Sequence, residues 1–178
     1  RNAVLAAMQI LSQEFVIGKD FKDIEKLSNL EEDAFSFDML GEAARTESQA
    51  ENYFNAYMNA IDEVGKLNLI KNLSNGVSIK ISALHPRYEM RKIHNLESVL
   101  IPKLLELIHY AKSKDVEITI DAEEQDRLSL SLHIIEMLAY DKALKDWPGF
   151  GIALQAYGKR SHDVIYWPVS YTHLTLPT

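Results

Sequence analysis

Polar and apolar residues alternate along the segment GVSIKISALHPRY, residues 76–88. This period of two predicts a β-strand over 77–84, with Val77, Ile79 and Ile81 on one face and Ser78, Lys80 and Ser82 on the other. If both faces of the strand are covered, as in a parallel α/β sheet, Lys80 points into protein. Because a buried ammonium needs a partner or a function, Lys80 is a candidate site residue.

The chain before this strand shows helical spacing. Apolar residues predict one helix over 3–15 and a second over 20–34, and a long helix follows that Thr46 or Ser48 is placed to cap. The segment NLSNG, residues 72–76, is a turn signal. We therefore predict a helical region over residues 1–75.

After residue 76, predicted strands alternate with predicted helices. Further strands are expected over 116–123 and 149–157, and the helices between the strands over 96–115, with Pro102 as a possible kink, and over 126–144. Strands separated by helices of this length indicate crossover connections and a parallel sheet. The predicted fold class is therefore α/β, either a barrel or a doubly wound sheet.

Each predicted strand brings a polar side chain into or beside its apolar run: Lys80 on the first strand, Asp121 at the end of the second and Gln155 near the end of the third. In a parallel barrel the chemistry gathers at the carboxyl ends of the strands, so these three side chains can face one pocket that suits an anionic small molecule. Each also has a simpler interpretation, namely an exposed lysine on an edge strand, an aspartate in a helix cap or turn, and a glutamine that satisfies backbone groups. A strand lysine is equally what a Schiff-base aldolase would use.

Composition excludes several function classes. The 178 residues carry a net charge of -7 and no basic cluster with interleaved aromatics, which argues against a nucleic-acid surface. Cysteine is absent, so disulfides, thiolate metal sites and cysteine nucleophiles are excluded. The apolar runs are too short to cross a membrane, and the start of the chain has neither a cleaved signal pattern nor an initiator Met, so we expect it to begin inside a longer protein.

Other polar residues are weaker candidates. His85 precedes Pro86, and we interpret it as a turn histidine bonded to the backbone in preference to a catalytic one. The remaining histidines show no pair at metal-ligand spacing. The acidic group Glu123, Glu124 and Asp126 is interpreted as the first turn of a helix, where negative charge is favourable.

Four segments carry a resemblance to a known family: FDMLGEAA (37–44), VSIKISALHPRY (77–88), IDAEEQDRL (120–128) and ALQAYGKR (153–160). They resemble the proline dehydrogenase domain of proline utilisation A, a bacterial bifunctional flavoenzyme, from about residue 3 to about residue 166. The resemblance implies a modified (β/α)8 TIM-like barrel, with the first three β/α units over 76–166 here. It also implies FAD as cofactor and oxidation of L-proline to Δ1-pyrroline-5-carboxylate with electrons passed to a membrane quinone. NAD is expected only if a longer parent protein carries an aldehyde dehydrogenase half.

The resemblance also assigns roles to residues. The lysine that matches Lys80 helps to bind the proline carboxylate, and the aspartate that matches Asp121 belongs to the polar network near substrate and flavin. The glutamine that matches Gln155 contacts the flavin ring. Glu42 matches a glutamate that pairs with a substrate-binding arginine and helps to close the site, although the pattern by itself indicates a solvated helix residue.

The chain departs from the family pattern after residue 166. The fourth-strand motif and the paired arginines of the last barrel helix are missing, and residues 167–178 show no helical period. We interpret this tail as foreign or out-of-frame sequence, with a natural divergent terminus as the alternative. Three strands cannot close a barrel, so we expect the chain alone to bind FAD poorly and not to oxidise proline.

Two rival functions stay open at this point. One is a Schiff-base lyase that uses Lys80, and the other is a non-catalytic interaction module in which residues 1–75 bind a partner. For the proline dehydrogenase interpretation, we expect a cytoplasmic protein, with peripheral attachment to the inner membrane and homo-oligomerisation as further possibilities of the parent protein.

Overall fold

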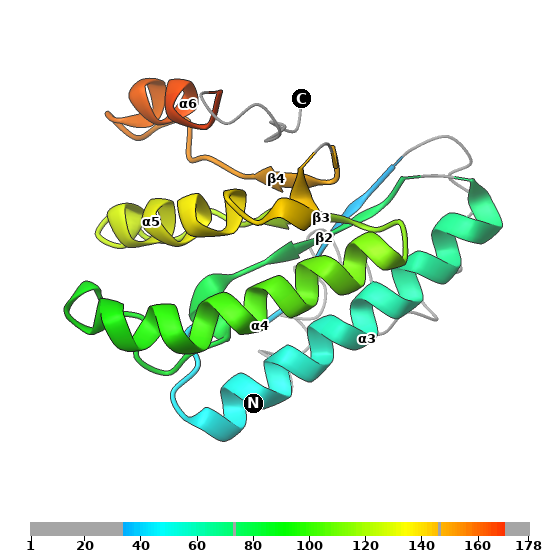
Figure 1. Cartoon of the computed structure of the whole chain (residues 1–178), viewed down its shortest axis with the longest axis horizontal. Helices are drawn as coiled ribbons and strands as arrows, with labels where there is room; N and C mark the ends of the chain where they lie inside the picture. Colours follow the sequence, from blue (N-terminus) through cyan, green and yellow to red (C-terminus); the bar gives the residue numbers. More distant parts are fainter. Residues whose placement is uncertain (1–33, 73, 146, 170–178) are drawn as a thin grey trace, which may run out of the picture. The chain divides into compact units, whose positions relative to one another are not determined.

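The computed structural model describes residues 34–72, 74–145 and 147–169. In this part of the chain four short strands alternate with helices, as Figure 1 shows. The strands are β1 Ser36–Asp38, β2 Gly76–Ile79, β3 Glu117–Ile120 and β4 Phe150–Ile152. The α-helices are α3 Glu47–Lys71, α4 Ile93–Ser113, α5 Leu128–Ala139 and α6 Ser161–Val169, and the 3-10 helices are η1 Ile81–Ala83, η2 Met90–Lys92 and η3 Lys142–Leu144.

The strands form one parallel sheet in the order β1-β2-β3-β4. Asp38 lies opposite Ser78, and Ile79 lies opposite Ile120. The carboxyl ends of the strands therefore meet at one edge of the sheet, which we call the carboxyl edge. This arrangement confirms the predicted α/β class and parallel sheet.

The strand β1 corrects the prediction of a wholly helical region over residues 1–75. Phe35 and Phe37 alternate with Ser36 and Asp38, which is a strand pattern, but three residues are too few for periodicity to stand out. The strand is fixed from outside, since the backbone N–H of Phe35 donates to Asn75 Oδ1 at 2.8 Å. The helices predicted over 3–15 and 20–34 lie outside the described residues.

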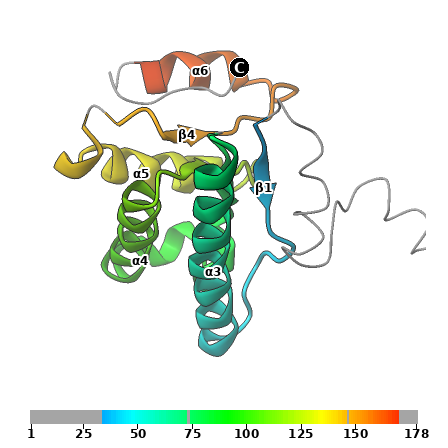
Figure 2. The same ribbon diagram turned by 90° about the vertical axis from the view of Figure 1, so that its right-hand side faces the viewer.

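The core lies between the sheet and the helices that Figure 2 shows on one side of it. Side chains on one face of β2 and β3 are fully buried: Val77, Ile79, Ile118 and Ile120. The inner face of α4 buries Leu100, Leu104 and Leu107 with no exposed surface. The other face of the strands carries Ser78 and Thr119, and the same face continues to Lys80 and Asp121 beyond the strand ends. The polar face of the period-two pattern is therefore the face that holds the site.

The long helix α3 begins where the sequence predicts a cap. Thr46 Oγ1 accepts a hydrogen bond from Gln49 N at 3.1 Å, and Gln49 Oε1 accepts one from Arg45 N at 2.9 Å. The helix ends at Asn72, whose φ of 53° is the left-handed conformation common after a helix. The helix α3 thus begins at a side-chain cap and ends in a left-handed residue, as the Thr46 cap and the 72–76 turn predicted.

Element ends differ from the predicted ones. The strand predicted over 77–84 ends at Ile79, because the chain turns into η1 directly after Lys80. The helix α4 runs through Pro102, and α6 continues to Val169, past the predicted boundary at residue 166. Residues 170–178 of the predicted tail lie outside the described residues.

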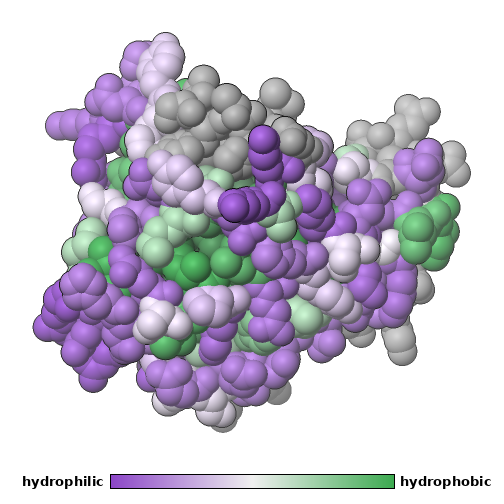
Figure 3. All heavy atoms as spheres, in the orientation of Figure 1, coloured by the Kyte–Doolittle hydropathy of each residue, from purple (hydrophilic) through white to green (hydrophobic). Residues whose placement is uncertain are grey.

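The surface in Figure 3 is mostly hydrophilic, with hydrophobic side chains gathered near its middle and in a separate group at its right-hand edge. Of the helices that the structure describes, none combines the length and the apolar content that a bilayer-spanning helix requires.

Candidate active site

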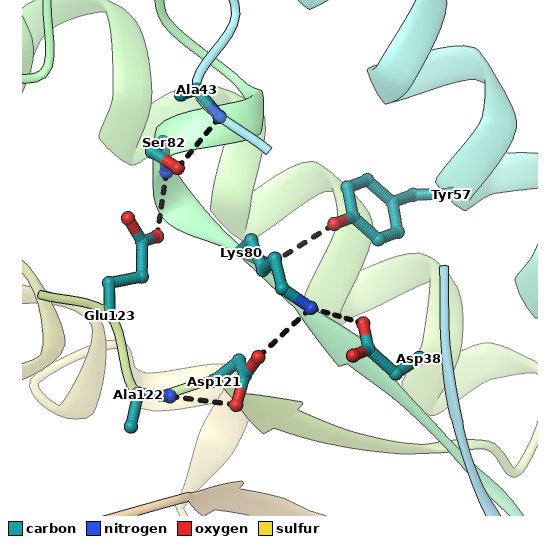
Figure 4. A network of polar contacts seen from close by, with 8 residues as sticks. All are labelled: Asp38, Ala43, Tyr57, Lys80, Ser82, Asp121, Ala122 and Glu123. Atoms are coloured by element: carbon teal, nitrogen blue, oxygen red, sulfur yellow. Dashed lines mark hydrogen bonds and ion pairs between the residues drawn. The ribbon is translucent and has the colours of Figure 1, made fainter. Parts of the chain in front are cut away.

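Three charged side chains from three neighbouring strands meet at the carboxyl edge, as Figure 4 shows. Lys80 follows β2, and its Nζ donates a hydrogen bond to Asp38 Oδ1 at the end of β1. The same Nζ lies 3.0 Å from Asp121 Oδ2, directly after β3. The side chain of Lys80 is only 13% exposed, so this ammonium is largely removed from water and is balanced by two carboxylates.

The two carboxylates decide the protonation of Lys80. Burial, the largest single effect, lowers the pKa of Lys80, but hydrogen bonds to Asp38 and Asp121 and the charges of both outweigh it. The pKa is therefore raised above its ordinary value, and the amine is a cation at neutral pH. This cation can attract the carboxylate of a substrate.

The backbone of Lys80 is held by Tyr57, from the middle of α3. The N–H of Lys80 donates to Tyr57 Oη at 3.1 Å, and the Tyr57 side chain is almost fully buried. Burial outweighs this hydrogen bond and raises the pKa of Tyr57 to about 12, so the phenol stays protonated. Tyr57 thus fixes the point at which the chain leaves β2 and turns into η1.

A second network lies beside the lysine and links three loops. Ser82 Oγ accepts a hydrogen bond from Ala43 N, and Ser82 O accepts one from Ala44 N, both at 3.0 Å. Ser82 N donates to Glu123 Oε1 at 2.8 Å. The loops after β1, β2 and β3 are therefore joined through Ser82, which gives the carboxyl edge a fixed shape (Figure 4).

Glu123 corrects the interpretation of an acidic first helical turn. The helix α5 begins only at Leu128, and the Glu123 side chain is 5% exposed. Its Oε2 is buried without a hydrogen bond, 3.5 Å from Arg127 Nη1. Burial is the main cause of a raised pKa for Glu123, against hydrogen bonds from Ser82 that lower it. Glu123 is thus a buried part of the site's frame.

Gln155 lies in the loop after β4, at the same edge as Asp121. Both residues line a small cavity of about 40 Å³ between the ends of β3 and β4. Gln155 Oε1 accepts a hydrogen bond from Gln125 Nε2 at 3.1 Å. Its own Nε2 has no hydrogen-bond partner within the described residues, which leaves two N–H groups available to a ligand.

Glu42 is the one predicted site residue that the structure does not bring into this cluster. It is exposed, and within the described residues it makes no hydrogen bond or ion pair. It lies in the loop after β1, where Gly41 adopts φ +134° and a Cβ would lie 2.3 Å from the Tyr53 ring. The sharp path of this loop needs a glycine, and it carries Glu42 outward.

Three residues of the site were missed from the sequence: Asp38, Tyr57 and Ser82. Asp38 ends a strand too short to recognise, although the alternation of Phe35 to Asp38 was a usable signal. Tyr57 matches the apolar face of an ordinary amphipathic helix, and nothing in its spacing indicates a bond to another element. Ser82 was assigned to the strand face, whereas the turn at η1 directs it to two other loops.

The histidines take local roles. His85 Nδ1 accepts a hydrogen bond from Arg87 N at 3.0 Å, which agrees with the predicted turn histidine. His109 lies 3.1 Å from Asp141, and His133 lies 2.7 Å from Glu97. In the described ranges, no group of three or more His, Asp or Glu side chains could hold a metal ion.

Comparison with known proteins assigns the chain to a family. The profile of the family described as proline dehydrogenase matches residues 21–173. The chain is 40% identical over 170 residues to the bifunctional protein PutA of Escherichia coli, a match that covers 93% of this chain and 13% of that protein. It is 40% identical over 168 residues to PutA of Rhizobium meliloti, with 93% and 14% covered.

Solved structures agree with these relatives. A mutant of Bradyrhizobium japonicum proline utilization A superposes with a TM-score of 0.77 at 40% identity, over 90% of this chain and 17% of that chain. Proline utilization A of Bdellovibrio bacteriovorus superposes with a TM-score of 0.86 at 20% identity, over 98% and 21%, which shows a shared fold. The chain thus spans a small part of these proteins, and through the family profile and its relatives it belongs to the proline dehydrogenase family.

Proposed function

We propose that this chain forms the substrate-facing part of an FAD-dependent proline dehydrogenase, which oxidises L-proline to Δ1-pyrroline-5-carboxylate. The observation that carries the proposal is the Lys80 cation at the carboxyl edge, held between Asp38 and Asp121. Family membership supports the same reaction. Because the chain covers 13% of its PutA relative, the activity is proposed for a longer protein that contains this segment.

Proline is a zwitterion, and the charges of the site suit it. The Lys80 ammonium attracts the proline carboxylate, while Asp121 and Asp38 orient the ammonium through their own contacts with Nζ. The carboxylates also offer a negative environment to the proline ring nitrogen. A charged clamp of this kind holds the substrate in one orientation, which is a main contribution of the protein when a cofactor supplies the chemistry.

Gln155 is the residue we propose to hold the cofactor. Bound FAD would supply the oxidation itself by accepting a hydride from the proline carbon next to nitrogen. The free Nε2 of Gln155 suits an acceptor atom on the edge of a flavin ring. The 40 Å³ cavity beside it is too small to enclose a flavin, so Gln155 would offer this N–H group to the cofactor at the open carboxyl edge.

We also keep two further proposals for the longer protein. Glu42, exposed beside the site, would pair with an arginine from another part of that protein and help to close the site over proline. A membrane quinone is the proposed electron acceptor for a cytoplasmic, peripherally attached and oligomeric enzyme.

The raised pKa of Lys80 weighs against the Schiff-base alternative. A lysine that forms a Schiff base must lose its proton near neutral pH, and enzymes achieve this by lowering its pKa. Here the two carboxylates act in the opposite direction. Borohydride trapping of a carbonyl compound on Lys80 would restore the alternative.

The decisive experiment is proline-dependent bleaching of flavin absorbance in a longer protein that contains this chain. We expect wild-type protein to bleach, and Lys80→Ala to need at least about tenfold more proline, because the carboxylate then loses its charged partner. A suitable control is Lys142→Ala, which removes an exposed lysine of η3. Bleaching that is unchanged in Lys80→Ala would contradict the assigned role.

The 178-residue chain alone is expected to be inactive. The strands β1 and β4 are the outer strands of the described sheet, so the sheet does not close on itself here. Flavin content after purification and proline turnover both test this prediction, and a stoichiometric flavin with turnover would contradict it.

A further inference from the structure

A second cavity opens at the carboxyl edge, and we call it the arginine cavity. It has a volume of about 420 Å³, and its wall includes Arg45, His85, Arg87 and Arg127. These side chains come from three loops, those after β1, β2 and β3. Ser82 lies in its wall, but Lys80 and Asp121 do not, so the cavity lies beside the proposed proline site.

The charge of this cavity is opposite to that of the whole chain. The chain has a net charge of -7, yet three guanidinium groups surround one hollow. Arg45 and Arg87 are exposed, and within the described residues neither guanidinium forms a hydrogen bond or an ion pair. The acidic residue of the wall, Glu89, pairs with Arg91, although Arg87 also helps to lower its pKa.

His85, which also lines the arginine cavity, supplies a further donor. The residue is 4% exposed, and its Nδ1 accepts the hydrogen bond from Arg87 N. The neutral ring must therefore carry its proton on Nε2. Burial is the main cause of a lowered pKa for His85, which keeps the ring neutral at physiological pH. The Nε2–H group has no partner among the residues that the structure describes.

The third arginine is held in place by its neighbours. Arg127 Nη1 lies 3.5 Å from Glu123 and 3.4 Å from Glu124, and neither contact is a close hydrogen bond. The guanidinium lies over the Tyr88 ring, 5.8 Å from its centroid. Tyr88 is fixed in turn by a 2.9 Å hydrogen bond with Ser131. Arg127 is thus oriented and still has N–H groups to offer a ligand.

We propose that the arginine cavity binds a phosphate group, either free or as a phosphate ester. Guanidinium groups bind phosphate through paired hydrogen bonds, and a tetrahedral anion can accept bonds from several sides at once. An amino acid fits less well, because its ammonium would meet three arginines, and the one carboxylate in the described wall, Glu89, is paired with Arg91. The volume exceeds that of phosphate, so an organic remainder has room.

Titration of inorganic phosphate into the 178-residue chain tests the proposal by calorimetry at low ionic strength. We expect saturable binding that Arg87→Ala and, separately, Arg45→Ala weaken by at least about tenfold. Both residues are exposed, and neither guanidinium has a hydrogen bond or ion pair within the described ranges, so neither change should impair folding, and circular dichroism checks this. The matched control is Lys142→Ala, which removes one positive charge on η3 before β4, away from the carboxyl edge.

Two results would overturn the proposal. The first is the absence of saturable binding. The second is equal binding in Arg87→Ala and Lys142→Ala, which would indicate general attraction to surface charge. Phenyl phosphate distinguishes a site for a phosphate ester from a site for free phosphate. If phenyl phosphate binds more tightly than inorganic phosphate, the ligand is an ester, and if it binds more weakly, the ligand is the free anion. Either result supports the phosphate site.

Discussion

The two ends of the sheet handle buried polar groups in opposite ways. At the amino end, Asn68 and Asn75 are buried and neutral, and they bond to each other and to the backbone. Asn68 Nδ2 donates to Asn75 O and Asp115 O, while Asn68 Oδ1 accepts from Asn75 N and Nδ2 at 2.7–3.1 Å. At the carboxyl end, Lys80 and its carboxylates are charged and partly open to solvent.

The amino end of the sheet therefore serves stability, and the carboxyl end serves ligand binding. The asparagine pair satisfies its own groups within the protein, so it contributes order and leaves nothing for a ligand. The arginine cavity keeps donors that have no partner among the described residues, which costs little where water reaches them and lets a ligand bind. The carboxyl end is also where β/α folds place their chemistry.

The largest expected effect is on stability at the amino end. Asn68→Ala removes four hydrogen bonds and leaves the backbone N–H and the Nδ2 group of Asn75 without the acceptor that Asn68 Oδ1 provides, so we expect a loss of about 3 kcal/mol in the free energy of unfolding. Urea denaturation measures it. Asn55→Ala, an exposed asparagine of the same helix, is the matched control and should change little. Equal effects of the two changes would show that the buried pair adds no stability.

A smaller loss in the free energy of unfolding is expected from Tyr57→Phe. Tyr57 lies on α3 and bonds to the backbone of Lys80 at the carboxyl edge. The N–H of Lys80 loses its acceptor in a partly buried place, at a cost of about 1 kcal/mol. The control is Tyr53→Phe on the same helix, where the tyrosine hydroxyl accepts a bond from the Gln49 side chain and none from the backbone of the described residues. In a longer flavin-containing protein, Tyr57→Phe should also raise the proline concentration needed for bleaching. A stability loss with unchanged proline response would limit Tyr57 to the fold.

Lys80→Met should cost less stability than either change, under about 1 kcal/mol by urea denaturation. The methionine keeps the apolar stem of the side chain, and water can reach Asp38 and Asp121, whose side chains are 53% and 24% exposed. A loss as large as that of Asn68→Ala would mean that the carboxyl end is also built for stability.

The smallest effect concerns pH. The folded-state pKa of Lys80 is raised above 10.5, because Asp38 and Asp121 outweigh the effect of burial. A raised pKa on a lysine gives a stability contribution that is complete below the unfolded value and is lost as pH rises through the folded value. The difference in unfolding free energy between wild type and Lys80→Met should stay constant from about pH 8 to about pH 10 and then fall. A difference that is already falling near neutral pH would contradict the assigned ion pairs.

Much of the fold could be predicted because its signals are local. The alternation around Lys80, the Thr46 cap and the helical spacing of α4 and α5 are properties of neighbouring residues, and they led to a parallel α/β sheet. The strand β1 could not be predicted in the same way, since three residues carry little periodicity and its hydrogen bonds come from Asn75 and β2. The end of β2 was also predicted wrongly, because the chain turns into η1 where it contacts other loops.

The residues of the candidate site also fall into those that the sequence predicts and those that only tertiary contacts bring together. The sequence by itself determined which residues bring charge to the ends of the strands, Lys80 and Asp121, because a polar residue inside or after an apolar run is visible in one dimension. Only the tertiary structure decided that Asp38 joins them, that Glu123 is buried against Ser82, and that three arginines and His85 surround one cavity. Those groupings depend on parallel register and on loops that cross between strands, and residues about 40 positions apart meet only when the sheet has formed.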